Sequence, residues 1–179
     1  MKSKTKELTY IAIMAAILAI LSTISIQIGT IPLTLSVFGV LIIAIIAGAK
    51  KSTAAVFIYI LLGAVGLPVF SGFKGGIQVL VGPTGGYIIS YIFMTVIVGM
   101  VSDKLKGASL KNMALLFLSC IAGIAVCYLF GTVQYVLISS SDWATALKYC
   151  VYPFIGFDLI KSIIAVFVGT KIKKRISNT

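Results

Sequence analysis

The stretch FIGFDLIKSII, residues 154–164, places two opposite charges, Asp158 and Lys161, in the middle of an apolar segment. A spacing of three residues puts both side chains on one face of a helix. If the segment lies in a membrane, such charges are costly unless they face the protein interior or a water-filled cavity. How these two charges are accommodated therefore depends on the rest of the chain.

The composition favours lipid as the solvent of this chain. Of its 179 residues, 60% are hydrophobic and 11% are charged, and the mean hydropathy is +1.15. Soluble domains are about half apolar and about a quarter charged, and a soluble fold of this length cannot hide so much apolar surface. No linker, low-complexity run or short repeat divides the sequence. We expect a single membrane-embedded domain over residues 1–179 and an all-α, multi-pass fold.

Six transmembrane helices are predicted, at residues 7–26, 33–49, 52–67, 84–102, 111–138 and 150–171. The first is expected to be a retained helix and not a signal peptide, because its apolar stretch is long and lacks a clear A-x-A-like cleavage site.

The distribution of basic residues predicts the topology. With the N-terminus inside, twelve of the 15 Lys and Arg residues fall in inner segments, and only Lys74 and Lys148 fall in outer loops. The positive-inside rule then places both termini in the cytoplasm. The basic charge is thus explained by topology beside anionic lipid, and no nucleic-acid partner is expected.

On this topology the last span begins outside, near residue 150. Asp158 then lies roughly 12 Å and Lys161 roughly 16 Å into the membrane. Two interpretations stay open: an ion pair that locks helix packing, or the polar floor of a pocket. A carboxylate acceptor next to an ammonium donor suits a small ligand that carries both donors and acceptors.

The long third loop lies at the same outer end. It reads LPVFSGFKGGIQVLVGPTGG, residues 67–86, and is rich in glycine. Loops of this length are often functional, and glycine lets the backbone approach a ligand closely. Pro83 and Thr84 are a plausible start for the fourth span, whose first N–H groups are free to receive an anion or a carbonyl. The alternative is that these glycines only permit a tight re-entrant turn or close helix packing.

The first span carries small residues at helical spacing. They form two overlapping small-x-x-x-small pairs, made by Ala12, Ala15, Ala16 and Ala19. Such faces let helices approach closely in lipid. The face packs either on a neighbouring span of this chain or on a partner protein.

Several aromatic residues are candidates for core, membrane interface or ligand contact. Tyr87 and Tyr91 lie one turn apart after the glycine loop, and Tyr128 and Tyr135 lie seven apart on the fifth span. Trp143, in an outer loop, is either an interface anchor or a cover for a pocket.

The sequence argues against catalysis by this chain. Histidine is absent and the acidic residues number four, so no acid–base dyad or metal site can be assembled, and no metal or cofactor is expected. The three cysteines are expected to be small packing residues.

No G-x-x-x-x-G-K-[ST] motif occurs, so ATP hydrolysis by this chain is not expected. Uphill transport would need another chain or an ion gradient. A small structural or pore-forming oligomer is the alternative, but the spans show few of the polar stripes that it requires.

Two stretches carry a resemblance to a known family. They are IPLTLSVFGVLIIAIIAGAKKSTAAVFIYILLGAVGLPVFSGFKGGIQVLVGPTGGYIIS, residues 31–90, and YPFIGFDLIKSIIA, residues 152–165. Within them, LLGAVGLPVF, GPTGGY and the Asp-x-x-Lys of the last span are the specific features. The chain resembles the BioY family, the biotin-specific S components of energy-coupling-factor (ECF) vitamin transporters. Between the two stretches the likeness is mainly one of apolar character and length.

The resemblance implies a six-helix, substrate-binding subunit in a bacterial plasma membrane. It implies capture of biotin from outside, docking on a transmembrane coupling subunit and two cytoplasmic ATPases, and toppling of the subunit during transport. The face of Ala12 and Ala16, with Ala15 and Ala19 beside it, would meet the coupling subunit. The third loop and the last three helices would bind the ligand, which points to Gly75, Gly76, Gln78, Thr84, Gly85, Tyr87, Tyr91, Asp158 and Lys161.

The sequence departs from the family pattern at two places. Ser36 replaces a glutamine that is common after P-[IL]-T-L, and Gly156-Phe157 replaces a frequent Pro-Gly before the aspartate.

Biotin suits the expected pocket, because its ureido group offers N–H donors and a carbonyl, and its tail ends in a carboxylate. Asp158 would accept from the ureido group, whereas Lys161 would meet either the carbonyl or the carboxylate. An S component for riboflavin or thiamine is the alternative within this reading.

Overall fold

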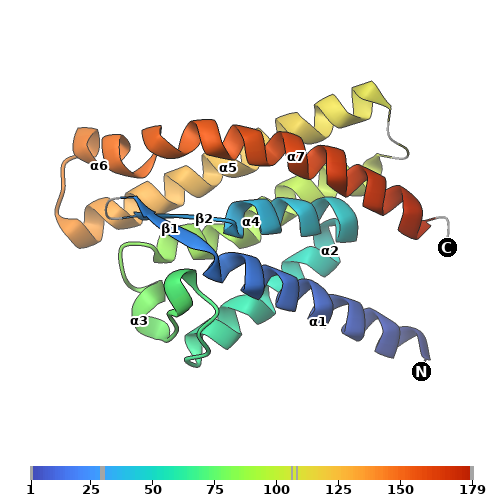
Figure 1. Ribbon diagram of the computed structural model, residues 1–179, viewed down its shortest axis with the longest axis horizontal. Coiled ribbons are helices and arrows are strands. Elements are labelled where there is room, and N and C mark those ends of the chain that lie inside the picture. Colours follow the sequence, from blue (N-terminus) through green and yellow to red (C-terminus); the bar gives the residue numbers. More distant parts are fainter. Residues whose placement is uncertain (1, 29–30, 106, 108, 178–179) are drawn as a thin grey trace.

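The computed structural model describes residues 2–28, 31–105, 107 and 109–177. Its long helices run roughly along one axis of the molecule (Figure 1). They are α1 (Lys2–Thr23), α2 (Ser36–Ala64), α4 (Gly85–Lys104), α5 (Leu110–Ser139) and α7 (Tyr152–Ser177). The shorter elements are strands β1 (Ser25–Ile28) and β2 (Ile31–Thr34), the 3-10 turn η1 (Ser71–Phe73), and helices α3 (Ile77–Leu80) and α6 (Trp143–Cys150). The predicted helical fold is therefore confirmed, with a small β-hairpin added.

Five of the helices in the described part of the chain are long and apolar enough to cross a membrane. The fourth and fifth predicted spans match α4 and α5 to within two residues at each end. Long uninterrupted apolar runs explain this agreement, because a helix satisfies all its backbone hydrogen bonds internally in lipid. The last predicted span, 150–171, began inside what the structure shows to be a separate short helix, α6.

Helix α2 contains a sharp break that divides it into two segments. Gly48 has φ +72° and ψ 178°, which is non-helical, and the chain reverses direction there (Figure 1). The two segments, residues 36–47 and 49–64, correspond to the predicted second and third spans. The Asp103 carboxylate of α4 accepts the Ala49 N–H at 3.0 Å, so it satisfies one of the amides left free where the second segment begins.

The β-hairpin corrects the sequence prediction at the first connection. Residues 25–28 pair antiparallel with residues 31–34, with Ser25 opposite Thr34 and Gln27 opposite Pro32. The first predicted span ran into β1, and the second began within β2. The apolar run from α1 continues through Ile24, Ile26 and Ile28, and so it reads as a longer helix.

Side-chain caps start two helices. Ser109 accepts the Asn112 N–H at the start of α5, and Asp142 accepts the Thr145 N–H at 3.0 Å at the start of α6. Hydrogen bonds from the side chain and backbone of Thr145 hold the pKa of the exposed Asp142 carboxyl below its ordinary value. Asp142 thus belongs to the cap of α6, which positions Cys150 and the start of α7.

The main core lies between α2, α4, α5 and the inner faces of α1 and α7. Its fully buried side chains include Leu18, Val40, Tyr59, Met94 and Cys120. Helices α4 and α5 approach closely at Gly86, where a Cβ would overlap the Phe130 carbonyl. Close approach at small residues is how helices associate in lipid.

The two ends of the molecule differ in charge. The start of α1, the break within α2, the end of α4, the start of α5 and the end of α7 lie at one end of the long axis, and the two strands, α3 and α6 lie at the other (Figure 1). The first end therefore gathers Lys50, Lys51, Lys104, Lys111 and the basic C-terminal turn. The basic residues thus gather at one end of the bundle, and their position at the cytoplasmic face of a membrane stays a prediction.

Candidate functional site

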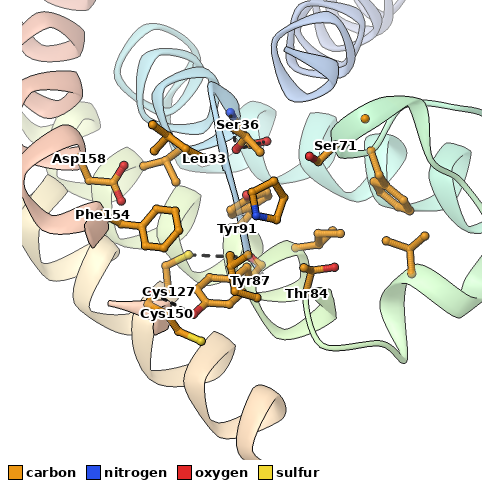
Figure 2. Close-up of a pocket in the computed structure, with 18 of the residues that line it drawn as sticks. Leu33, Ser36, Ser71, Thr84, Tyr87, Tyr91, Cys127, Cys150, Phe154 and Asp158 are labelled. Carbon is orange, nitrogen blue, oxygen red and sulfur yellow. Dashed lines mark hydrogen bonds between the residues drawn. The ribbon is translucent and has the colours of Figure 1, made fainter. Parts of the chain in front are cut away.

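A cavity of about 150 Å³ lies at the hairpin end of the bundle. The hairpin, α2, the third loop, α4, α5 and the α6–α7 region all contribute to its lining (Figure 2). Most lining side chains are apolar or aromatic, and a few polar groups lie among them. This mixture is typical of small-molecule sites, where apolar walls supply buried area and a few polar groups fix orientation.

Asp158 and Lys161 form the predicted pair and border this cavity. Lys161 Nζ lies 2.9 Å from Asp158 Oδ1, and the two side chains are only 12% and 4% exposed. Their spacing on α7 brings them together on one helical face, as expected. Asp158 projects from α7 into the cavity (Figure 2). The pair is therefore both an internal ion pair and part of a pocket wall.

Two further contacts compensate the burial of these charges. Tyr128 Oη on α5 donates to Asp158 Oδ2 at 2.7 Å, and Lys161 Nζ donates to the Thr34 carbonyl at the end of β2 at 2.8 Å. A buried ion pair needs such additional hydrogen bonds to offset its desolvation. The pair thus ties α7 to α5 on one side and to the hairpin on the other.

Aromatic side chains make a further part of the cavity lining. Tyr87 and Tyr91 project from α4 across from Phe154 of α7 (Figure 2). Tyr87 Oη donates to the Cys150 carbonyl at 3.2 Å. Tyr59 of α2 meets Phe70 edge-on, with ring centroids 5.5 Å apart. Such rings offer large apolar surfaces against which a small molecule can pack.

Five of the nine predicted ligand residues line the cavity, and four do not. The lining set is Thr84, Tyr87, Tyr91, Asp158 and Lys161. The other four, Gly75, Gly76, Gln78 and Gly85, shape the third loop behind it.

Backbone geometry explains the positions of these four residues. A Cβ at Gly75 would overlap the Leu67 carbonyl, and one at Gly85 would overlap the Leu80 carbonyl. Gly76 has φ +96°, and its N–H donates to the Gly63 carbonyl at 2.7 Å. Gln78 Nε2 donates to the Gly75 carbonyl at 2.8 Å. At these four positions the loop therefore shows close packing and tight turns, which is the structural alternative to ligand contact.

Several lining residues were not predicted. The hairpin contributes Gln27, Pro32 and Leu33, the third loop contributes Ser71 and Lys74, and the helices contribute Cys127, Cys150 and Phe154. Tyr128, which the sequence left open as a core, interface or ligand-contact residue, also lines the cavity. An aromatic or cysteine residue inside an apolar span carries no distinguishing signal in a single sequence. Lys74 had one signal, since few lysines lie at the outer end.

The alanine face of α1 divides into two parts. Ala15 is 2% exposed and Ala19 packs against the core, whereas Ala12 and Ala16 are exposed. The Ala15 side chain is covered by its own chain, so a partner helix would meet this face at Ala12 and Ala16, and docking there stays a prediction. The exposed pair, Ala12 and Ala16, remains a candidate contact surface.

The described residues contain no cluster of three or more His, Cys, Asp or Glu side chains that would hold a metal ion. Cys120, Cys127 and Cys150 are free thiols and buried. Two of them, Cys127 and Cys150, border the cavity.

The chain is similar to proteins named as biotin transporters over nearly its whole length. It is 39% identical to "Biotin transporter BioY" of Thermotoga maritima over 170 residues, which cover 94% of this chain and 96% of that protein. It is 33% identical to "Biotin transporter BioY2" of Lactococcus lactis over 177 residues, which cover 99% and 95%.

A solved structure has the same fold. It is described as the S-component for biotin from an ECF-type ABC transporter, and it matches with a TM-score of 0.85 and 29% identity over 97% of this chain and 93% of that chain. A sequence model of the BioY family matches residues 1–178. Since that match covers almost every residue, the chain belongs to the BioY family.

Proposed function

We propose that this chain is the biotin-binding S component of an ECF-type ABC transporter. The observation that carries the proposal is the buried Asp158–Lys161 pair at the wall of an aromatic-lined cavity in a chain of the BioY family. Relatives named as biotin transporters and a neighbour described as the biotin S-component support the same ligand.

The chemistry of the cavity suits biotin. Asp158 has used one lone-pair site on each carboxylate oxygen, which leaves acceptor capacity for the two ureido N–H groups. The rings of Tyr87, Tyr91 and Phe154 would cover the apolar bicycle. Lys74 and Lys161 both border the cavity. Because Lys161 already donates to Asp158 and Thr34, Lys74 is the freer cation for the tail carboxylate.

The same proposal fixes the orientation in the plasma membrane. The basic end, with both termini and the Gly48 turn, would face the cytoplasm under the positive-inside rule. With α2 counted as two spans, the chain crosses the bilayer six times. The cavity then opens toward the outside, where biotin is captured.

Energy for uptake would come from other chains. The sequence has no phosphate-binding loop, so we assign ATP hydrolysis to two cytoplasmic ATPase subunits that act through a transmembrane coupling subunit. Ala12 and Ala16 are exposed on α1, and small residues let a partner helix approach closely. This surface is our candidate for docking of the coupling subunit.

Uptake of radiolabelled biotin tests the proposal. The chain is expressed in bacterial cells that lack their own biotin transporter, alone or with a coupling subunit and ATPases. We expect accumulation that needs the partner subunits and is abolished by unlabelled biotin but not by riboflavin or thiamine. Competition by riboflavin or thiamine would contradict the ligand, and full accumulation with catalytically dead ATPases would contradict the energy source.

A further inference from the structure

The hydroxyl group of Tyr128 on α5 contacts the Asp158 carboxylate on α7. It donates to Asp158 Oδ2 at 2.7 Å, across a sequence separation of 30 residues. Hydrogen bonds to an ionised acceptor are short and about twice as strong as neutral ones. Tyr128 also lines the cavity, so this contact forms at the wall where a ligand would bind.

Lys161 cannot fix the carboxylate in the same way. It contacts Asp158 Oδ1 from three residues along the same helix, and its contact with the hairpin, at the Thr34 carbonyl, acts on the carboxylate only through this flexible side chain. Tyr128 belongs to α5, and its ring packs against both hydrophobic clusters of the protein. The Tyr128 hydroxyl therefore holds the Asp158 carboxylate at a fixed position relative to α5, a second helix that lines the cavity.

We propose that Tyr128 is a positioning residue for ligand binding, which orients the Asp158 carboxylate so that its remaining lone pairs face the ureido N–H groups. This inference rests on the proposed function, because it assigns those N–H groups as the donors that Asp158 receives. With Oδ1 directed to Lys161 and Oδ2 to Tyr128, the carboxylate plane is fixed at both oxygens. Pre-organisation of this kind raises affinity by reducing the ordering that binding requires.

A neighbouring tyrosine provides the matched control. Tyr87 lines the same cavity and also donates its hydroxyl, but to the Cys150 carbonyl at 3.2 Å. Loss of either hydroxyl removes one hydrogen bond at the cavity wall. We expect the Tyr128 hydroxyl to affect ligand binding through Asp158, and the Tyr87 hydroxyl to affect it independently of Asp158.

A double-mutant cycle on the full chain separates the two roles. The biotin affinity of Tyr128→Phe and Tyr87→Phe is measured alone and combined with Asp158→Asn, by calorimetry in detergent. We expect Tyr128→Phe to weaken binding about tenfold alone, and about threefold or less in the Asp158→Asn background, where the bond to a neutral amide is weaker. Tyr87→Phe should change affinity by the same factor in both backgrounds. Equal factors for Tyr128→Phe in the two backgrounds, or no effect alone, would overturn the proposal.

A second measurement does not depend on ligand. The chain has four acidic residues, so the carboxylate bands in its infrared spectrum are few, and Asp158→Asn identifies the band of Asp158. Tyr128→Phe should shift that band in the ligand-free protein, and Tyr87→Phe should not. An unshifted band would overturn the inference. Absence of biotin binding by the unaltered protein, together with a shifted band, would instead locate the failure in the proposed function.

Discussion

At the residue scale, the Asp158–Lys161 pair brings together three separate parts of the fold. Tyr128 comes from α5, the Thr34 carbonyl from the hairpin, and the pair itself from α7. Removal of one partner from a buried ion pair usually costs about 3–5 kcal/mol of stability, because the other charge is left uncompensated. Affinity and stability must therefore be measured separately for every variant of this pair.

Asp158→Asn is expected to weaken biotin binding at least tenfold, about 1.4 kcal/mol. The amide replaces an ionised acceptor with a neutral one, and so the hydrogen bonds from ligand N–H groups are weaker. Calorimetry gives the affinity, and size-exclusion chromatography and thermal unfolding show that the variant is folded. Asp142→Asn is the matched control, because Asp142 caps α6 and does not line the cavity. Unchanged affinity in folded Asp158→Asn would remove this residue from the site.

Lys74→Gln is expected to weaken binding of biotin about tenfold but to leave binding of biotin amide nearly unchanged. Lys74 borders the cavity and would meet the tail carboxylate, which the amide lacks. Titration of both ligands into both proteins gives the comparison. Lys148→Gln, at the same end but outside the cavity lining, serves as the control. An equal loss for the two ligands would show that Lys74 does not recognise the carboxylate.

At the element scale, apolar length predicted the helices, whereas the turns depended on contacts that a single sequence does not reveal. The break between the second and third spans was predicted beside Lys50 and Lys51, and the structure places it at Gly48. The hydrogen bond that helps to form this break comes from Asp103, 54 residues away. The hairpin was missed because three isoleucines continue the apolar pattern of α1.

The contrast between local sequence patterns and contacts across the fold also explains which site residues could be predicted. Charges within an apolar span are rare and costly, so Asp158 and Lys161 could be found by composition alone. Tyr128 and Phe154 look like any other apolar or aromatic residue in a span, and only the packing of α5 against α7 brings them to the cavity. The hairpin residues could not be assigned while their segment was read as helix.

Gly48→Ala is expected to destabilise the protein by about 1–3 kcal/mol, because φ is positive there and the new Cβ would overlap the Asp103 carboxylate. Thermal unfolding in detergent measures the change. Gly156→Ala on α7 is the control, since open space surrounds that position, and alanine favours a helix by about 0.5–1 kcal/mol. If Gly48→Ala is as stable as Gly156→Ala, the break in α2 does not need glycine.

At the scale of the whole molecule, the cluster of basic residues and the cavity lie at opposite ends of the bundle. The basic residues gather with the termini, and the cavity lies beside the hairpin and α6. Binding and docking are therefore expected to be separable, because the proposed ligand contacts lie around the cavity and the proposed docking surface lies at the exposed Ala12 and Ala16 of α1.

Ala16→Trp is expected to block assembly with the coupling subunit and to leave biotin affinity within about twofold. Ala16 is exposed, and an indole there would hold a partner helix away from α1. Co-purification with the coupling subunit and ATPases measures assembly, and calorimetry measures affinity. Ile163→Trp, at an exposed position on α7, is the matched control. Normal assembly and uptake by Ala16→Trp would place the docking surface elsewhere.

The most direct test of the central claim is calorimetric titration of the detergent-purified, monodisperse protein with biotin, with riboflavin and thiamine as controls. The account predicts tight binding of one biotin per chain and no heat with the other two vitamins. A folded sample that binds none of the three, or that prefers riboflavin or thiamine, would contradict it and leave the Asp158–Lys161 pair as a packing device.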